Sequence, residues 1–163
     1  MRTIPCLVWA IIVVVSSLTR AIAQDTKTVN AAIEELNALD QPLDATYTNL
    51  SAMSETASEN EYAKIQMVLN GIERARASVT QLLMVSSIFT TMRDQRDTNT
   101  VRRYLSLACK AVDQTTTAAS GVANKILPRL VSPALVQEVT KARDQVDQIN
   151  QSKLCKTVPA WKS

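Results

Sequence analysis

The sequence contains no histidine and only two glycines, Gly71 and Gly121. The lack of histidine excludes serine–histidine and cysteine–histidine nucleophile pairs, and it excludes zinc or haem held by histidine. Two isolated glycines cannot form a phosphate-binding loop or a dinucleotide-binding fingerprint, because each needs several glycines close together. We therefore expect a protein that is not an enzyme and that carries no cofactor and no metal.

Aromatic residues make up only 4% of the chain and rarely alternate with the basic ones. Base-stacking platforms are therefore absent, and we expect no nucleic-acid partner. Two carboxylate pairs, Glu34 with Glu35 and Asp144 with Asp147, resemble acid–base pairs in spacing alone. Since nothing in the sequence indicates a cleft around them, we interpret both pairs as solvated surface charge.

Residues 1–23 have the order of a cleavable secretory signal peptide. A short basic start precedes an apolar run from Ile4 to Leu18, and the small-residue motif Ala21-Ile22-Ala23 precedes Gln24. The apolar run is shorter than the roughly 20 residues that a helix needs to cross a bilayer. An uncleaved signal anchor is the alternative. We expect export to the extracellular space, or to the periplasm in a bacterium, with no stable membrane insertion after cleavage.

Charge is unevenly distributed along the chain. Removal of Arg2 and Arg20 with the signal would leave 16 basic and 15 acidic residues, a net charge of +1. Residues 24–61 carry one basic and eight acidic residues, whereas residues 62–163 carry 15 basic and seven acidic ones. Either the acidic segment packs beside the basic ones, or a basic face meets an anionic partner such as a polysaccharide or a membrane surface.

A heptad pattern predicts a long first helix over residues 26–57. Its small or apolar positions follow alternating steps of three and four residues: Ala32, Leu36, Leu39, Leu43, Thr46, Leu50, Met53 and Ala57. The pattern keeps its phase through Pro42, which predicts one helix kinked where that residue removes a backbone hydrogen bond. The alternative is two helices, with Pro42 opening the second.

The second predicted helix, residues 58–91, begins at a capping box made by Ser58 and Glu61. Its apolar stripe is wide enough to contact two neighbouring helices. The stripe comprises Ile65, Val68, Ile72, Ala75, Val79, Leu82 and Phe89, and it is widened by Leu69, Leu83, Val85 and Ile88. Residues 93–99 have no apolar side chain, which predicts a turn.

Two further helices follow this turn. The third would be capped by Asp97 or Thr98 and would end at Pro128; its seam is Val101, Leu105, Ala108, Val112, Thr115, Ala119, Val122 and Ile126. Ser132 and Pro133 would begin the fourth, whose seam is Leu135, Val139, Ala142, Val146 and Ile149. Short connections make successive helices antiparallel neighbours, so we expect an all-α, up-down-up-down four-helix bundle over residues 24–152.

The exported chain would contain two cysteines, Cys109 and Cys155. They are equidistant from residue 132, at the edge of the predicted turn between the third and fourth helices, so they should lie at the same height in an antiparallel pair. An oxidising compartment favours their pairing. We predict a Cys109–Cys155 disulfide that pins the tail, residues 153–163, against the bundle.

The predicted function is that of a secreted, non-catalytic interaction protein that binds a protein or glycan partner. Binding would use an exposed helix face or a basic inter-helix turn containing Arg93, Arg96, Arg102 and Arg103. The alternative is a carrier of a small apolar ligand in the bundle core near residues 115–121, opposite soft side chains such as Met67 or Met84. Asn49 and Asn150 begin Asn-x-Ser motifs and are predicted glycosylation sites if the host is eukaryotic.

Overall fold

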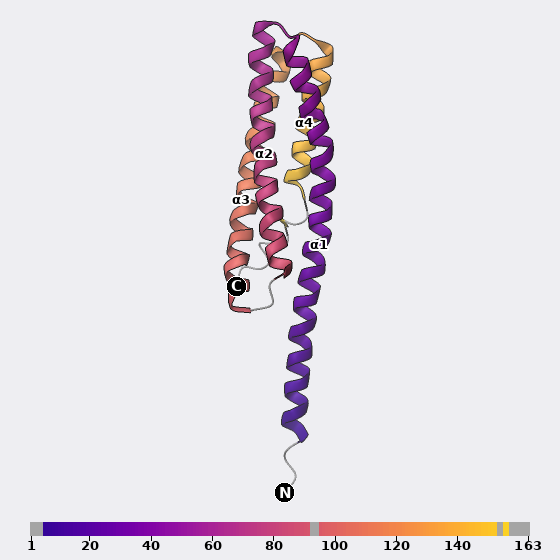
Figure 1. The fold of residues 1–163 in the computed structure, drawn as a ribbon, viewed down its shortest axis with the longest axis vertical. Helices are drawn as coiled ribbons and strands as arrows, with labels where there is room; N and C mark the ends of the chain where they lie inside the picture. Colours follow the sequence, from indigo (N-terminus) through magenta and orange to yellow (C-terminus); the bar gives the residue numbers. More distant parts are fainter. Residues whose placement is uncertain (1–4, 92–94, 153–154, 157–163) are drawn as a thin grey trace.

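The computed structural model describes residues 5–91, 95–152 and 155–156, with side chains for residues 29–91, 99–152 and 155–156. Its elements are α1 (Pro5–Glu55), α2 (Glu59–Thr91), α3 (Gln95–Ile126), a short 3-10 helix η1 (Leu127–Arg129) and α4 (Pro133–Asn150). The described residues form four packed helices, which run alternately up and down (Figure 1). The predicted fold class is confirmed.

Helix α1 is continuous through Pro42, so the alternative of two separate helices is wrong. Pro42 cannot donate a hydrogen bond to the carbonyl of Ala38. Both residues are exposed, which leaves that carbonyl open to water, so the helix can continue. The predicted kink stays a prediction. The start of α1 includes residues that were predicted to form a signal peptide, and it extends beyond the other helices (Figure 1).

The predicted seams form the core. All five seam residues of α4 are buried, and the α1 leucines Leu36, Leu43 and Leu50 are fully buried. The α2 stripe is also buried from Ile65 to Phe89, whereas Ile88, predicted to widen it, is exposed. The heptad phase therefore located most of the core. In α3 the predicted seam residues Thr115 and Val122 are only half-buried, and their neighbours Thr116 and Ala123 are buried.

The four helices are arranged around a square. Helix α1 packs against α2 and α4, and α3 packs against the same two helices, so α1 and α3 occupy opposite corners. Helix α4 is shorter than α2 and α3 and ends partway along the bundle (Figure 1). None of the helices in the described part of the chain has the length and hydropathy that a membrane span requires.

The turns differ from the predictions in two ways. Helix α3 begins at Gln95, so Asp97 and Thr98 lie inside its first turn and are not N-caps. The capping box at α2 is half formed: the Glu61 N–H donates to the Ser58 hydroxyl at 3.4 Å. The Glu61 carboxylate instead accepts the backbone N–H groups of Val131 and Ser132, just before α4.

Candidate functional site

Of the four arginines in the predicted basic turn, the structure describes the side chains of two, Arg102 and Arg103. Arg93 lies outside the described residues, and the side chain of Arg96 is not described. Arg102 is half-buried, whereas Arg103 is exposed. Adjacent residues of a helix point about 100° apart because the helix has about 3.6 residues per turn. Of the two described arginines, Arg103 is therefore the one on the outer surface.

Acidic and basic residues are concentrated on different helices of the bundle. The part of α1 from residue 24 onward carries six acidic residues and one basic residue, whereas α3 carries five basic and two acidic residues. Because these helices lie on opposite corners, their charges do not meet directly. The acidic helix is paired instead by Arg76 of α2, whose Nε lies 3.2 Å from Asp40 Oδ1 and which also contacts Asp44.

The hydrogen bonds to Asp40 hold the pKa of the Arg76 guanidinium above its ordinary value, and the charges of Asp40 and Asp44 add to this effect. Of the two expected arrangements, the structure shows part of the first, in which charges complement each other within the fold; the anionic partner stays a prediction. Charges complement each other within the fold between α1 and α2, while the basic outer face of α3 is not covered by the acidic helix.

Five large apolar side chains of α2 and α3 are more than half exposed. Met67 (53%) lies toward the start of α2, and the other four are Met84 (62%) and Ile88 (51%) of α2 and Tyr104 (58%) and Leu107 (54%) of α3. We call these last four residues the α2–α3 apolar patch. Scattered exposed apolar residues are normal on a soluble protein, but a contiguous group commonly marks an interaction site. Whether these four are contiguous depends on the register between α2 and α3.

The Ser78–Thr115 hydrogen bond, 2.7 Å between the two hydroxyl oxygens, sets that register. Ile88 lies ten residues along α2 from Ser78, and Tyr104 lies eleven residues back along α3 from Thr115. In an antiparallel pair these separations bring Ile88 and Tyr104 to the same height. Met84 and Leu107 lie about one turn closer to the Ser78–Thr115 hydrogen bond. The four residues therefore lie at neighbouring heights on α2 and α3.

In the described segments that contain the patch, residues 80–91 and 99–112, the charged side chains are all basic. Residues 80–91 of α2 contain no charged side chain, and residues 99–112 of α3 contain three basic residues and no acidic one. Arg103 and Lys110 are exposed and seven residues apart, so they share a face of α3 next to Tyr104 and Leu107. Apolar residues outside the seam of a predicted helix were the signal in the sequence that could have indicated this patch.

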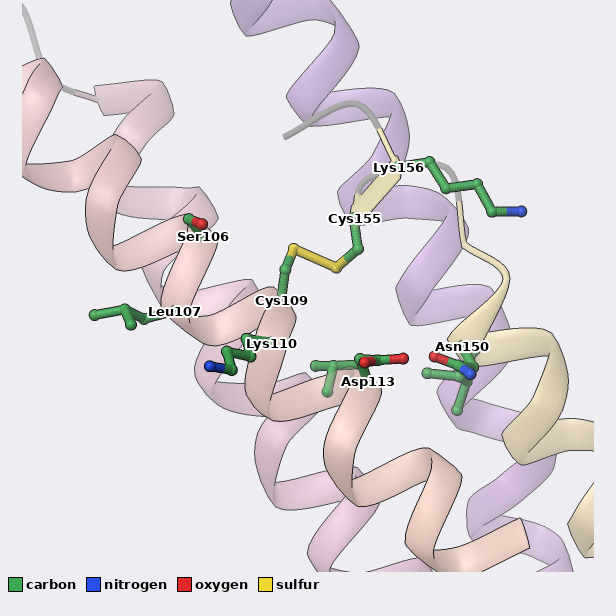
Figure 2. Close-up of a pocket in the computed structure, with 10 residues that line it drawn as sticks. Ser106, Leu107, Cys109, Lys110, Asp113, Asn150, Cys155 and Lys156 are labelled. Atoms are coloured by element: carbon green, nitrogen blue, oxygen red, sulfur yellow. A yellow bond between two sulfur atoms is a disulfide. The ribbon is translucent and has the colours of Figure 1, made fainter. Parts of the chain in front are cut away.

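The Cys109–Cys155 disulfide is present, as predicted, with a Cα–Cα distance of 5.3 Å. Beside it is a cavity of about 430 Å³ between α3 and the end of α4. Figure 2 shows Asp113 and Asn150 pointing toward one another across this cavity, whereas the Lys110 and Lys156 side chains point apart. The two lysines therefore do not converge on an anion site.

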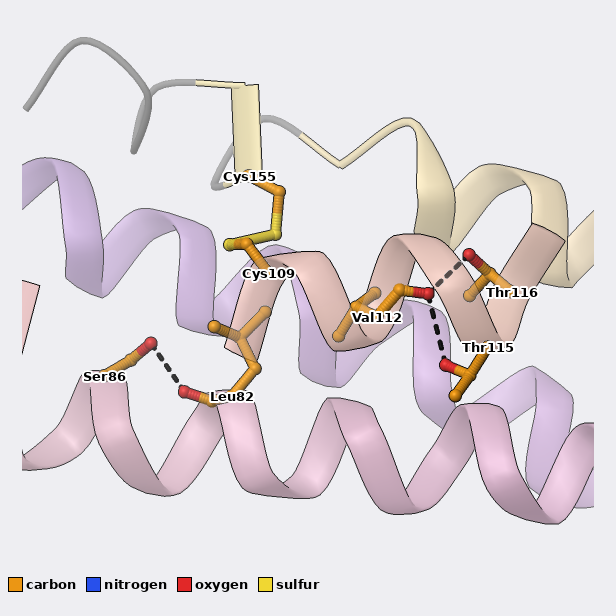
Figure 3. The surroundings of a disulfide bond; sticks show 7 residues. All are labelled: Leu82, Ser86, Cys109, Val112, Thr115, Thr116 and Cys155. Carbon is orange, nitrogen blue, oxygen red and sulfur yellow. Dashed lines mark hydrogen bonds between the residues drawn. A yellow bond between two sulfur atoms is a disulfide. The ribbon is translucent and has the colours of Figure 1, made fainter. Parts of the chain in front are cut away.

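The small-residue stretch at residues 115–121 packs closely against α2. A Cβ atom added at Gly71 would lie 3.3 Å from the Cα and Cβ atoms of Ala119. The Thr115 and Thr116 hydroxyls donate to the Val112 carbonyl within their own helix (Figure 3). Met67 and Met84, predicted to face this stretch, are exposed instead. These contacts indicate helix–helix packing, and the ligand-carrier hypothesis stays a prediction without support from them.

The predicted glycosylation sites have different surroundings. Asn49 is exposed near the C-terminal end of α1, whereas Asn150 is half-buried as the last residue of α4. Among the carboxylate pairs, Glu34 is exposed, and Asp144 accepts hydrogen bonds from Arg143 at 2.7 and 3.0 Å. Within the described residues, no group of three or more cysteine, aspartate or glutamate side chains could hold a metal ion.

No protein-family model matches the chain, and no curated protein or solved structure is significantly similar to it. The residues and their geometry are therefore the basis for the functional argument. They define a disulfide-linked four-helix bundle with a basic, apolar surface on α2 and α3.

Proposed function

We propose that this chain is a secreted, non-catalytic interaction protein that binds an acidic, amphipathic helical segment of another protein. The observation that carries the proposal is the α2–α3 apolar patch, four large side chains that are each more than half exposed. A partner helix could bury these side chains, as amphipathic helices do when they bind hydrophobic grooves.

Charge supports an acidic partner. Arg103 and Lys110 border the patch on α3, and no carboxylate lies in residues 80–91 or 99–112 to repel an acidic segment. Complementary charge at the rim of an interface accelerates association and disfavours partners of the wrong sign. The exposed Tyr104 is also a residue type that is enriched at the energetic centres of interfaces.

Export is supported by the disulfide, because disulfides persist mainly in oxidising compartments outside the cytosol. The helical scaffold would hold the patch rigidly, since α2 and α3 are joined through the Ser78–Thr115 hydrogen bond and the close approach at Gly71. A rigid face loses little conformational entropy when it binds.

A panel of synthetic helical peptides with one constant apolar face and an acidic, neutral or basic opposite face would test this proposal. We expect the acidic peptides to bind best and to weaken as salt is added. Tyr104→Ala or Leu107→Ala should weaken binding by about 1–2 kcal/mol, if these residues are at the centre of the interface. Arg103→Glu with Lys110→Glu should slow association and reverse the charge preference.

Lys125→Glu is the matched control, because Lys125 is also exposed on α3 but lies at the other end of the helix. Equal binding of all three peptide classes would contradict the proposal, and so would equal effects of the control and the patch variants. Retention on a sulfated polysaccharide that is insensitive to the Tyr104 and Leu107 variants would indicate a glycan partner instead.

A further inference from the structure

We infer that Asn150 is an N-glycan acceptor and that formation of the Cys109–Cys155 disulfide makes it inaccessible to the glycosylating enzyme. The oxidised fold then excludes modification at this position. The inference is independent of the proposed binding partner. It rests on the position of the Asn150-Gln151-Ser152 motif between the end of α4 and Cys155.

The motif is folded in the structure. Asn-x-Ser recognition uses the asparagine amide and the serine hydroxyl together, so both must reach the transferase active site. Ser152 is only 2% exposed, and its N–H donates to the Ile149 carbonyl at 3.0 Å. The Gln151 N–H donates to the carbonyls of Asp147 and Gln148, both at 3.1 Å. These bonds must break before the motif can extend.

The motif is held at both of its ends. On one side, Ile149 is fully buried in the bundle core. On the other side, Cys155 is covalently joined to Cys109 of α3, five residues after Asn150. Figure 2 shows the Asn150 side chain pointing toward Asp113, into the cavity between these two anchors. Opening the disulfide would release one anchor and allow residues 150–152 to leave the surface.

Ser152 destabilises the folded conformation of residues 150–152. Its Oγ is buried without a hydrogen-bond partner among the residues that the structure describes. Burial of an unsatisfied hydroxyl opposes folding, so the closed state of this segment depends on its anchors. Release of the disulfide should therefore shift the segment toward the open state more than it shifts the rest of the bundle.

Two covalent reactions compete for this segment. In glycosylation, the Asn150 amide nitrogen forms a bond to C1 of a lipid-linked oligosaccharide, the C1–oxygen bond to the lipid pyrophosphate breaks, and the amide proton passes to a base. In disulfide formation, the Cys109 and Cys155 thiols transfer two electrons and two protons to the disulfide of an oxidised thiol–disulfide oxidoreductase. A chain that is oxidised first is no longer an acceptor at Asn150.

Purified full-length chain, incubated with oligosaccharyltransferase and lipid-linked oligosaccharide, would test the inference. We would compare the oxidised protein with Cys155→Ser and measure glycopeptides at Asn150 by mass spectrometry. We expect at least about tenfold faster modification in the variant, which corresponds to about 1.4 kcal/mol of opening free energy. Asn150→Gln in the Cys155→Ser background should abolish this signal.

Asn49 is the internal control, because it lies in α1 and is not connected to the disulfide. Its modification should be the same in both proteins. Equal rates at Asn150 in the oxidised and Cys155→Ser proteins would overturn the inference, and so would a parallel rise at Asn49, which would indicate global unfolding. Failure to modify Asn150 even in the reduced, denatured chain would show that it is not an acceptor.

Discussion

The Glu61 carboxylate accepts the backbone N–H of Ser132 at 3.1 Å, joining the first turn of α2 to the start of α4 across 71 residues of sequence. Glu61 also accepts the N–H of Val131 at 3.2 Å, and Lys64 Nζ donates to the Arg129 carbonyl at 2.8 Å. The Ser132 side chain makes no capping hydrogen bond. Glu61 therefore supplies the negative charge that the N-terminal end of a helix favours.

This contact predicts a dependence of stability on pH. The hydrogen bonds from Ser132 and then Val131 lower the pKa of Glu61 below its ordinary value of 4.5. Because the pKa is lower in the folded state, the stabilisation is present above pH 4.5 and is lost as the pH falls through the folded pKa. Glu61→Gln should therefore reduce stability at neutral pH and flatten the loss of stability below pH 4.5.

Urea unfolding followed by circular dichroism between neutral pH and about pH 3 would measure this effect. Glu59→Gln is the control, because Glu59 lies in the same first turn of α2 and is exposed. If Glu61→Gln and wild type lose stability in parallel on acidification, the contact with Ser132 does not stabilise the bundle.

The disulfide should make the largest single contribution to stability. Cys109 and Cys155 are separated by 46 residues in sequence, and for a loop of this length the chain-entropy model gives about 4 kcal/mol. We expect a reductant to lower the free energy of unfolding by about this amount, measured by guanidinium titration with and without reductant. A loss below about 1 kcal/mol would mean that strain in the folded state offsets the entropic gain.

The two glycines should respond in opposite directions to alanine. Nothing lies within 4 Å of a Cβ atom built at Gly121, so Gly121→Ala should stabilise helix α3 by about 0.5–1 kcal/mol. At Gly71 the added Cβ would be 3.3 Å from the Cα of Ala119, which is backbone and cannot rotate away. Gly71→Ala should therefore push α2 and α3 apart and lower stability.

Thermal unfolding of the two variants would compare them directly. A rise in melting temperature for Gly71→Ala equal to that for Gly121→Ala would show that α2 and α3 are not in close contact at Ala119.

The Arg76–Asp40 pair should contribute modestly to the packing of α1 on α2. Its hydrogen bonds, at 3.2 and 3.4 Å, join two side chains that are 29% and 27% exposed, so solvent screens the interaction. A double-mutant cycle with Arg76→Gln and Asp40→Asn should give a coupling of about 0.5–1 kcal/mol. This coupling should fall in high salt; a value of zero at low salt would exclude the pair as a link between the helices.

Much of the fold follows from patterns that are local in sequence. The seam of α4 from Leu135 to Ile149 is buried in full, because a heptad phase depends only on the rotation of one helix about its own axis. The continuity of α1 through Pro42 followed from the same unbroken phase. Cys109 and Cys155 could be paired from their equal distance to one turn, because a short connection forces an antiparallel neighbour.

The candidate site depends on relationships between helices that no local pattern contains. Ile88 was predicted to widen the apolar stripe of α2 but is 51% exposed, because its burial depends on how α2 is rotated relative to its neighbours. The partner of Glu61 lies 71 residues away and could not be read from the Ser58-x-x-Glu61 motif.

The sequence by itself determined the helices, most of their apolar faces and the covalent link, because periodicity and chain connectivity act within or between adjacent segments. Only the tertiary structure decided that acidic α1 and basic α3 stand on opposite corners, and that Met84, Ile88, Tyr104 and Leu107 are exposed. The physical reason is that side-chain packing sets the rotation and order of the helices, and packing is a property of all four together.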